Sequence, residues 1–199
     1  LSSYTLSPDV ARHVRIVKNN AARMQRLIGE LMDFRRVDTG HYEPRYAEVN
    51  VSELLSSIAD NFNEVNGQRR MSLPEADVVI VSDRDALEKI LYNLVSNAYK
   101  YTPVGGWIEM TLLRERGRTT FRIANSGKGI KPEDIANVFN RFEILDNFER
   151  SAHEGRIMRN GIGLALAQSL AKTLSGEIAV VSKTGESTTF TLSLPEVSR

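Results

Sequence analysis

The sequence contains no cysteine, and it has neither a long apolar run nor a strong excess of charge of either sign. The absence of cysteine excludes disulfides and thiolate metal sites, and it is consistent with a reducing compartment. No stretch approaches the ~18 consecutive apolar residues of a membrane-spanning helix. The 26 Lys and Arg are balanced by 25 Asp and Glu, so we expect no bulk binding to nucleic acid or membranes. Any anion-binding site must therefore be formed by a local group of residues, not by an overall basic surface.

What remains is typical of a globular chain, with 41% hydrophobic and 26% charged residues among 199. This length allows one ordinary domain and an appended element. The chain opens on Leu1 rather than methionine and shows no signal peptide. We therefore expect an internal fragment of a longer protein, and the parent protein could still be membrane-bound.

Residues 1–40 are predicted to form one long helix. Ser7, Pro8 and Asp9 are typical of a helix start, because the hydroxyl caps the first turn and the carboxylate faces the positive end of the helix dipole. Small or apolar residues then recur at spacings of four and three, at Val10, Val14, Val17, Ala21, Met24, Ile28 and Leu31. This narrow heptad seam favours a partner helix. The alternative is an ordinary amphipathic helix that packs on its own domain.

Residues 41–45 are predicted to be a linker, and residues 46–199 a second domain. In that domain helical patterns alternate with strand patterns. Helices are expected from Asn50 or Ser52 to Phe62 and at 83–100 and 162–174, with strands at 46–49, 78–81, 107–113, 119–124, 177–182 and 188–194. The predicted fold class is α+β, a two-layer α/β sandwich in which helices cover one face of a mainly antiparallel sheet.

Three polar side chains recur on one face of the predicted helix at 83–100. Asn93 and Asn97 are four residues apart, and Lys100 follows three residues later. Carboxamide oxygens suit Mg²⁺, and a lysine supplies the point charge that a polyphosphate needs. Taken alone, the three residues are more typical of a solvated polar face.

Two glycine pairs follow. Asn125 ends a strand, and Gly127 and Gly129 follow it, where glycine allows a sharp turn or a close approach to a flat ligand. Gly161 and Gly163 open the helix at 162–174, where backbone N–H groups favour anions. Neither pair is specific alone, since the first could be a simple turn. The second has no parallel strand–helix–strand unit around it, and a Gly-Lys-Ser/Thr phosphate loop is absent.

A polar run up to Asn160 separates the two pairs and contains Arg150, Arg156 and Arg159. It is predicted to be either a functional lid or a plain surface loop. Phe139 and Phe142 are expected to anchor it, which leaves Arg141 free to reach a phosphate.

In this order, the motifs resemble those of the histidine kinase catalytic domain. That domain is a branch of the ATP-binding superfamily that also includes gyrase, the heat-shock chaperones and MutL. The resemblance covers Tyr46 to Pro195, and it implies a Bergerat-type fold that binds ATP and Mg²⁺. The first helix is similar to the second helix of the family's dimerisation hairpin, through Met24 to Ile28 and Leu31 to Phe34.

The resemblance also implies individual roles. Asn97 and Asn93 would hold Mg²⁺, Lys100 and Arg141 would contact phosphates, and Tyr101 would pack near the nucleoside. Asn125 stands where the family has its adenine-reading aspartate. The remaining expected nucleotide contacts are Gly127, Gly129, Ile130, Gly161, Gly163 and Leu164.

Three departures from the family pattern are visible. No phosphoacceptor motif surrounds His13, His41 or His153, so the acceptor histidine is expected on a missing preceding helix. Asn125 lacks the charge of an aspartate, which predicts weaker but retained ATP binding. Ser187 replaces a common glycine, a change that we expect to matter little.

The resemblance implies a sensor histidine kinase that phosphorylates a histidine and relays the group to a response regulator. We expect a homodimer through the helical hairpin, a membrane-anchored parent protein with this part on the cytoplasmic side of the inner membrane, and no nucleic-acid partner. Asn93 stands where hydrolysing relatives have a glutamate, and an amide cannot deprotonate water, so hydrolysis should be poor. The alternatives are a module that binds ATP weakly or not at all, as Asn125 suggests, and a structural coiled-coil adaptor.

Overall fold

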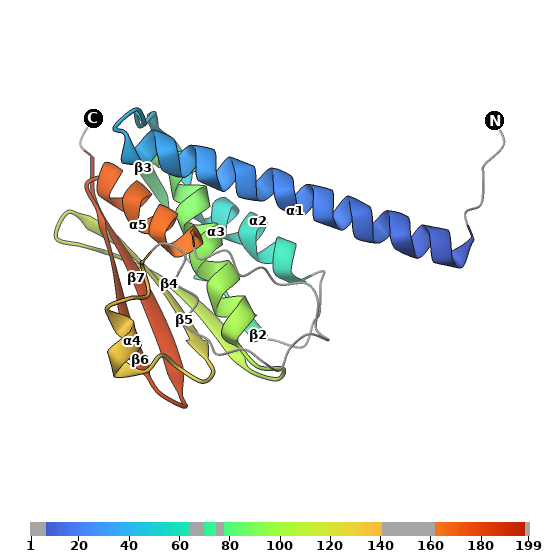
Figure 1. Cartoon of the computed structure of the whole chain (residues 1–199). Coiled ribbons are helices and arrows are strands. Elements are labelled where there is room, and N and C mark those ends of the chain that lie inside the picture. Colours follow the sequence, from blue (N-terminus) through green and yellow to red (C-terminus); the bar gives the residue numbers. More distant parts are fainter. Residues whose placement is uncertain (1–6, 64–69, 75–77, 141–161, 198–199) are drawn as a thin grey trace.

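A computed structural model describes residues 7–63, 70–74, 78–140 and 162–197 (Figure 1). The elements follow in the order α1 (Pro8–Asp38), β1 (Tyr46–Asn50), α2 (Val51–Asn63), β2 (Arg70–Ser72), β3 (Val79–Asp83), α3 (Arg84–Tyr101), β4 (Trp107–Glu115), β5 (Arg118–Ser126), α4 (Pro132–Ile135), α5 (Gly163–Thr173), β6 (Glu177–Lys183) and β7 (Ser187–Pro195). Among these residues, no helix combines the length and the apolar character needed to cross a membrane.

The strands form two sheets. The larger sheet has the order β2-β4-β5-β7-β6, and the smaller one pairs β1 with β3 in antiparallel fashion. In the larger sheet, every pairing is antiparallel except the short parallel pairing of β2 with β4. Helices α3 and α5 lie against one face of this sheet (Figure 1). The predicted two-layer α/β sandwich is therefore confirmed, whereas the strand β2, the one-turn helix α4 and the division into two sheets were not predicted.

The core lies between helix α3 and the inner face of the larger sheet. Strands β5 and β7 both alternate strictly between buried and less buried residues, so every second side chain faces the helices. Helix α3 contributes Leu87, Ile90, Leu91, Leu94 and Val95, all with 0% exposure. Burial of side chains of this size contributes ~1.5–3 kcal/mol each, so α3 is fixed firmly in the domain.

Helix α1 is anchored at one end only. Phe34 is buried, Val37 packs against the core, and the Asp33 carboxylate lies 2.5 Å from the Lys89 ammonium of α3. Towards the N-terminus the helix extends beyond the body of the domain (Figure 1). The six large residues of the predicted seam are 47–67% exposed: Val10, Val14, Val17, Met24, Ile28 and Leu31. The seam therefore faces solvent rather than the domain.

The carboxylate of Asp83 ties the linker to the start of α3. One oxygen accepts a hydrogen bond from the Ala86 N–H at 2.8 Å, which caps the helix, and another from the Tyr42 hydroxyl at 3.3 Å. The second oxygen accepts from the Arg45 N–H at 2.7 Å. Asp83 itself is only 4% exposed. A single buried side chain thus sets both the helix start and the path of the preceding chain.

We expect Asp83→Ala to lower the free energy of unfolding by about 2–4 kcal/mol, because the helix loses its cap and two further donors lose their acceptor. Urea denaturation would measure the change. Asp85→Ala is the matched control, since Asp85 is an exposed carboxylate in the same first turn. Equal losses in the two variants would contradict the role given to Asp83.

The Tyr42 phenol should make stability depend on alkaline pH. Burial, and then the nearby Asp83 carboxylate, raise the pKa of Tyr42 from 10.0 to about 12. The folded state therefore holds this proton more tightly, and the resulting stabilisation is complete below pH 10 and disappears as pH rises towards 12. We expect Tyr42→Phe to lose less stability than the wild type between pH 9 and pH 11.5. Urea midpoints of the two proteins across this pH range would measure the difference, and parallel pH profiles would contradict it.

Candidate nucleotide-binding site

The C-terminal half of α3 presents a polar face next to its buried one. Asn93, Asn97 and Lys100 are all partly exposed, whereas Leu94 and Val95 between them are buried. The Lys100 ammonium lies 2.8 Å from the Tyr101 hydroxyl and 4.5 Å from the centre of its ring. This pair combines a cation–π contact with a hydrogen bond and directs the lysine towards the end of the helix. The spacing prediction, three polar side chains along one edge of α3, agrees with the structure.

Asn93 lies directly against the start of helix α5. Its amide donates to the Lys89 carbonyl at 2.8 Å, and its Oδ1 occupies the space that a Cβ on Gly163 would need. Ile162, the residue before α5, offers no capping side chain, so the first N–H groups of this helix lack a side-chain cap. A carboxamide and an uncapped helix N-terminus therefore meet at one point, an arrangement suited to an anion with a bound cation.

Asn125 forms the other end of the site. It lies at the end of β5 and is 3% exposed, and its amide donates to the Ser126 carbonyl at 3.0 Å. Its cross-strand neighbours are Ile108 on β4 and Thr188 on β7. A buried amide between two strands has a fixed position, so its remaining polar atoms can read one edge of a ligand.

Two hydroxyls beside Asn125 were missed at the sequence level. Thr188 is buried, and its Oγ1 lies 2.8 Å from the Ser182 Oγ. Ser182 also donates to the Ser187 carbonyl at 2.8 Å and accepts from the Ile130 N–H at 2.8 Å. The alternation of apolar and polar residues in this strand could have identified Thr188, because it precedes Phe190 by two residues and therefore shares its inward face. These hydroxyls hold the loop after β5 against the β6–β7 hairpin.

The glycine loop after Asn125 passes close to two other backbone segments. A Cβ on Gly127 would lie 2.5 Å from the Tyr101 carbonyl oxygen, and one on Gly129 would overlap the Lys183 carbonyl. Gly129 also has a φ of 67°, in the left-handed region that favours glycine. The Gly185 N–H donates to the Lys128 carbonyl at 2.7 Å. The loop therefore joins the ends of α3, β5 and the β6–β7 hairpin.

The structure brings most of the predicted site residues to this end of the domain, including Ile130 and Leu164, which pack partly against the core. Arg141 and Gly161 lie outside the described residues, as do Phe142 and the predicted lid from 141 to 160. Phe139 is described, and its ring meets that of Phe190 edge-on, with centroids 6.2 Å apart. Phe139, two residues before the predicted lid, therefore packs against the core.

The described residues include no group of three or more His, Cys, Asp or Glu that could hold a metal ion. The amide oxygens of Asn93 and Asn97, together with the phosphates of a bound ligand, would form a donor set for a cation at this site. That donor set suits Mg²⁺, which usually takes only one or two protein ligands and shares substrate phosphates. The residues present thus fit a nucleotide-bound magnesium ion better than an independent metal centre.

We expect Gly129→Ala to destabilise the protein by about 1–3 kcal/mol more than Gly117→Ala. Both glycines have similar left-handed φ angles, 67° and 71°, so the backbone strain of an alanine is matched. They differ because nothing lies within 4 Å of a Cβ on Gly117, whereas a Cβ on Gly129 meets the Lys183 backbone. Urea unfolding of both variants would measure the difference, and equal losses would show that the close approach costs nothing.

Residues 82–198 match the family described as "Histidine kinase-, DNA gyrase B-, and HSP90-like ATPase". Histidine kinase P4 of Formosa agariphila is 34% identical, over 98% of this chain and 14% of that protein. Sensor histidine kinase WalK of Bacillus subtilis is 29% identical, over 94% of this chain and 31% of that protein. The chain therefore spans a third or less of these two relatives.

The fold has a match among solved structures as well. Full-length ShkA, crystallised with AMPPNP, superposes with a TM-score of 0.80 at 21% identity, over 98% of this chain and 40% of that one. The relatives matched along nearly all of the chain are histidine kinases, which confirms the resemblance predicted from the ordered motifs. The family match covers more than half of the chain, including α3, the glycine loop and α5. The chain belongs to the family of histidine kinase-, DNA gyrase B- and HSP90-like ATPases, in its histidine kinase branch.

Proposed function

We propose that this chain is the ATP-binding catalytic part of a sensor histidine kinase and transfers the γ-phosphoryl group of ATP to a histidine on another element. The observation that carries the proposal is the meeting of Asn93 with the uncapped start of α5 at Gly163. Asn125 and the glycine loop lie at the same end of the domain, beyond Tyr101. One elongated ligand with a flat group and an anionic group would satisfy both parts.

The base of the nucleotide is assigned to the Asn125 end. The amide oxygen of Asn125 can accept a hydrogen bond from the adenine amino group, and Gly127 and Gly129 leave room beside it. Thr188 and Ser182 support this end through their hydroxyl pair. An amide accepts more weakly than a carboxylate, so we expect a lower affinity than an aspartate would give.

The phosphates are assigned to the Asn93 end. Asn97 and Asn93 would supply amide oxygens to Mg²⁺, and Lys100 would supply a positive charge. Gly163 and Leu164 would donate backbone N–H groups at the start of α5. By resemblance to the family, Gly161 and Arg141 would be further phosphate contacts, and Tyr101 would contact the nucleoside. Bound Mg²⁺ would neutralise charge on the phosphates during transfer.

The acceptor is assigned to a histidine rather than to water. In the proposed transfer, the bond from the γ-phosphorus to its bridging oxygen breaks, a bond to an imidazole nitrogen forms, and ADP leaves. Asn93 cannot deprotonate water at neutral pH. Among the described histidines, His13 makes a hydrogen bond of 2.7 Å with the Asp9 carbonyl, and His41 makes one of 2.8 Å with the Thr39 hydroxyl. Neither has an acceptor motif around it, so the acceptor is expected on a preceding helix.

We further propose the organisation of the whole protein. Residues 1–40 would be the second helix of a dimerisation hairpin, 41–45 a linker and 46–199 the catalytic domain. The solvent-facing seam on α1 supports this, since apolar residues at heptad spacing are stabilised by a partner helix. The receiving partner would be a response regulator domain, and the parent protein a membrane-anchored sensor with this part on the cytoplasmic side.

A module that binds little or no ATP is the second candidate, and Asn125 favours it because the charged adenine contact is absent. The two candidates differ in what Mg²⁺ does to nucleotide binding. Calorimetric titration with a non-hydrolysable ATP analogue, with and without Mg²⁺, separates them. We expect saturable binding that depends on Mg²⁺; no binding at millimolar nucleotide by the folded protein would favour the second candidate.

We expect Asn97→Ala to weaken the Mg²⁺-dependent affinity by at least roughly tenfold, as loss of a metal-site group does elsewhere. Asn61→Ala is the matched control, because Asn61 is an exposed asparagine on α2 that bonds only to its own helix, through Ser57, among the described contacts. The same titration measures both variants. An unchanged affinity in Asn97→Ala would remove Asn97 from the proposed site.

A further inference from the structure

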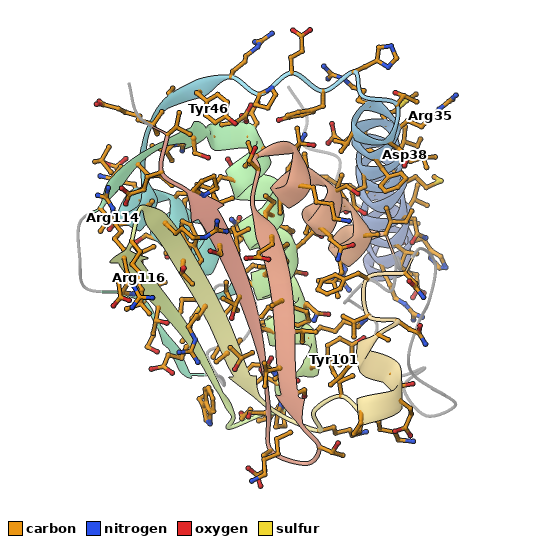
Figure 2. The ribbon with its side chains drawn as sticks, turned by 90° about the vertical axis from the view of Figure 1, so that its left-hand side faces the viewer. Arg35, Asp38, Tyr46, Tyr101, Arg114 and Arg116 are labelled. Carbon is orange, nitrogen blue, oxygen red and sulfur yellow. The ribbon has the colours of Figure 1, made fainter. Side chains whose placement is uncertain are left out.

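A cavity lies at the linker end of the domain, away from the glycine loop. It has a volume of about 150 Å³ and is formed where the β1–β3 sheet meets the ends of β4, β5 and β7. Tyr46 lines this cavity, whereas Tyr101 belongs to the proposed nucleotide site, and the two lie at opposite ends of the molecule in Figure 2. A cavity of about this volume is large enough for a benzene-sized molecule.

The walls of the cavity combine aliphatic side chains with polar groups in similar measure. Ile80, Leu174 and Leu194 are buried, and Val79 is 47% exposed, which places it near the opening. The apolar part of a ligand with roughly six to eight heavy atoms would be buried favourably against these aliphatic side chains.

Thr119 is the unusual member of the wall. It lies on the inner face of β5, in series with Phe121 and Ile123, where an apolar residue is the default. It is 2% exposed, and among the described residues its hydroxyl has no hydrogen-bond partner. A buried hydroxyl without a partner costs free energy. Since no hydrogen bond fixes its rotamer, a turn about χ1 can direct the hydroxyl to a group in the cavity.

The charges at the rim indicate a neutral occupant. Arg114 and Glu48 also line the cavity, and both already have partners: the Arg114 Nε lies 2.8 Å from the Glu196 carboxylate, and Glu48 makes an interaction within the protein. An ionised ligand group would lose its water shell and meet only charges that are already paired, which is unfavourable. A neutral group with one hydrogen-bonding atom meets no such cost.

We propose that this cavity is a binding site for a small neutral amphiphile, with a compact apolar body and a single hydroxyl or carbonyl that pairs with Thr119. The site is separate from the nucleotide site, because Thr119 and Asn125 are six residues apart on one strand, or ~20 Å. Tyr46 and Ser82, which line it, flank the Asp83 anchor of the linker. Its occupant would therefore touch the strands that follow the linker.

NMR titration of the full chain with 4-methylphenol and with toluene tests the proposal. The probes share a ring and a methyl group, but only 4-methylphenol has a hydroxyl. We expect saturable shifts at Thr119 and its cavity neighbours, with 4-methylphenol bound more tightly than toluene. Thr119→Val should weaken the binding of 4-methylphenol by roughly three- to tenfold and change the affinity for toluene by less than about twofold. Thr120→Val, the next residue on the opposite face of β5, should change neither affinity.

Thermal unfolding of the same variants gives an independent readout. If the Thr119 hydroxyl has no partner, Thr119→Val should unfold at the same temperature as the wild type or higher. A midpoint several degrees lower would show that the hydroxyl is bonded within the protein, and would overturn its assignment as a ligand contact. Equal affinity for the two probes, or shifts spread evenly over the surface up to 10 mM, would overturn the site itself.

Discussion

The burial of helix α3 is the constraint on which the rest of the structure depends. Its inner face is fully buried against the large sheet, so its rotation about its own axis is fixed. Because side chains four residues apart share a helix face, the same rotation also fixes Asn93 and Asn97 on the neighbouring face. The Asp83 carboxylate sets where the helix begins. Core packing and ligand geometry are therefore determined together by one element.

The sequence predicted those parts of the fold whose patterns are long and periodic. The strands β5 and β7 and the helices α1 and α3 all have a strong period, and their positions agree with the structure. Strand β2 has only three residues, too few for alternation to be recognised, and its pairing with β4 is parallel. The separation of β1 and β3 from the larger sheet depends on which strand edges meet, which a single-strand pattern does not encode.

The candidate site was predictable to the extent that its residues lie in ordered motifs. Asn93, Asn97, Asn125 and the glycines stand out because amides and glycines are unusual at such places. Ser182 and Thr188 do not stand out, since hydroxyl residues are common in strands and only their pairing across the hairpin gives them a role. The cavity beside Thr119 is still less visible, because it arises from the meeting of two sheets and the end of a helix.

The contact between Asn93 and Gly163 has a consequence for mutations. The side chain of Asn93 fills the space that a Cβ on residue 163 would need, so the size of one residue limits the size of the other. A larger residue at position 163 would push the Asn93 carboxamide, the far end of its side chain, away from the start of α5, or would require a smaller residue at position 93. A change at position 163 should therefore reach the site through residue 93, although 69 residues of sequence separate the pair.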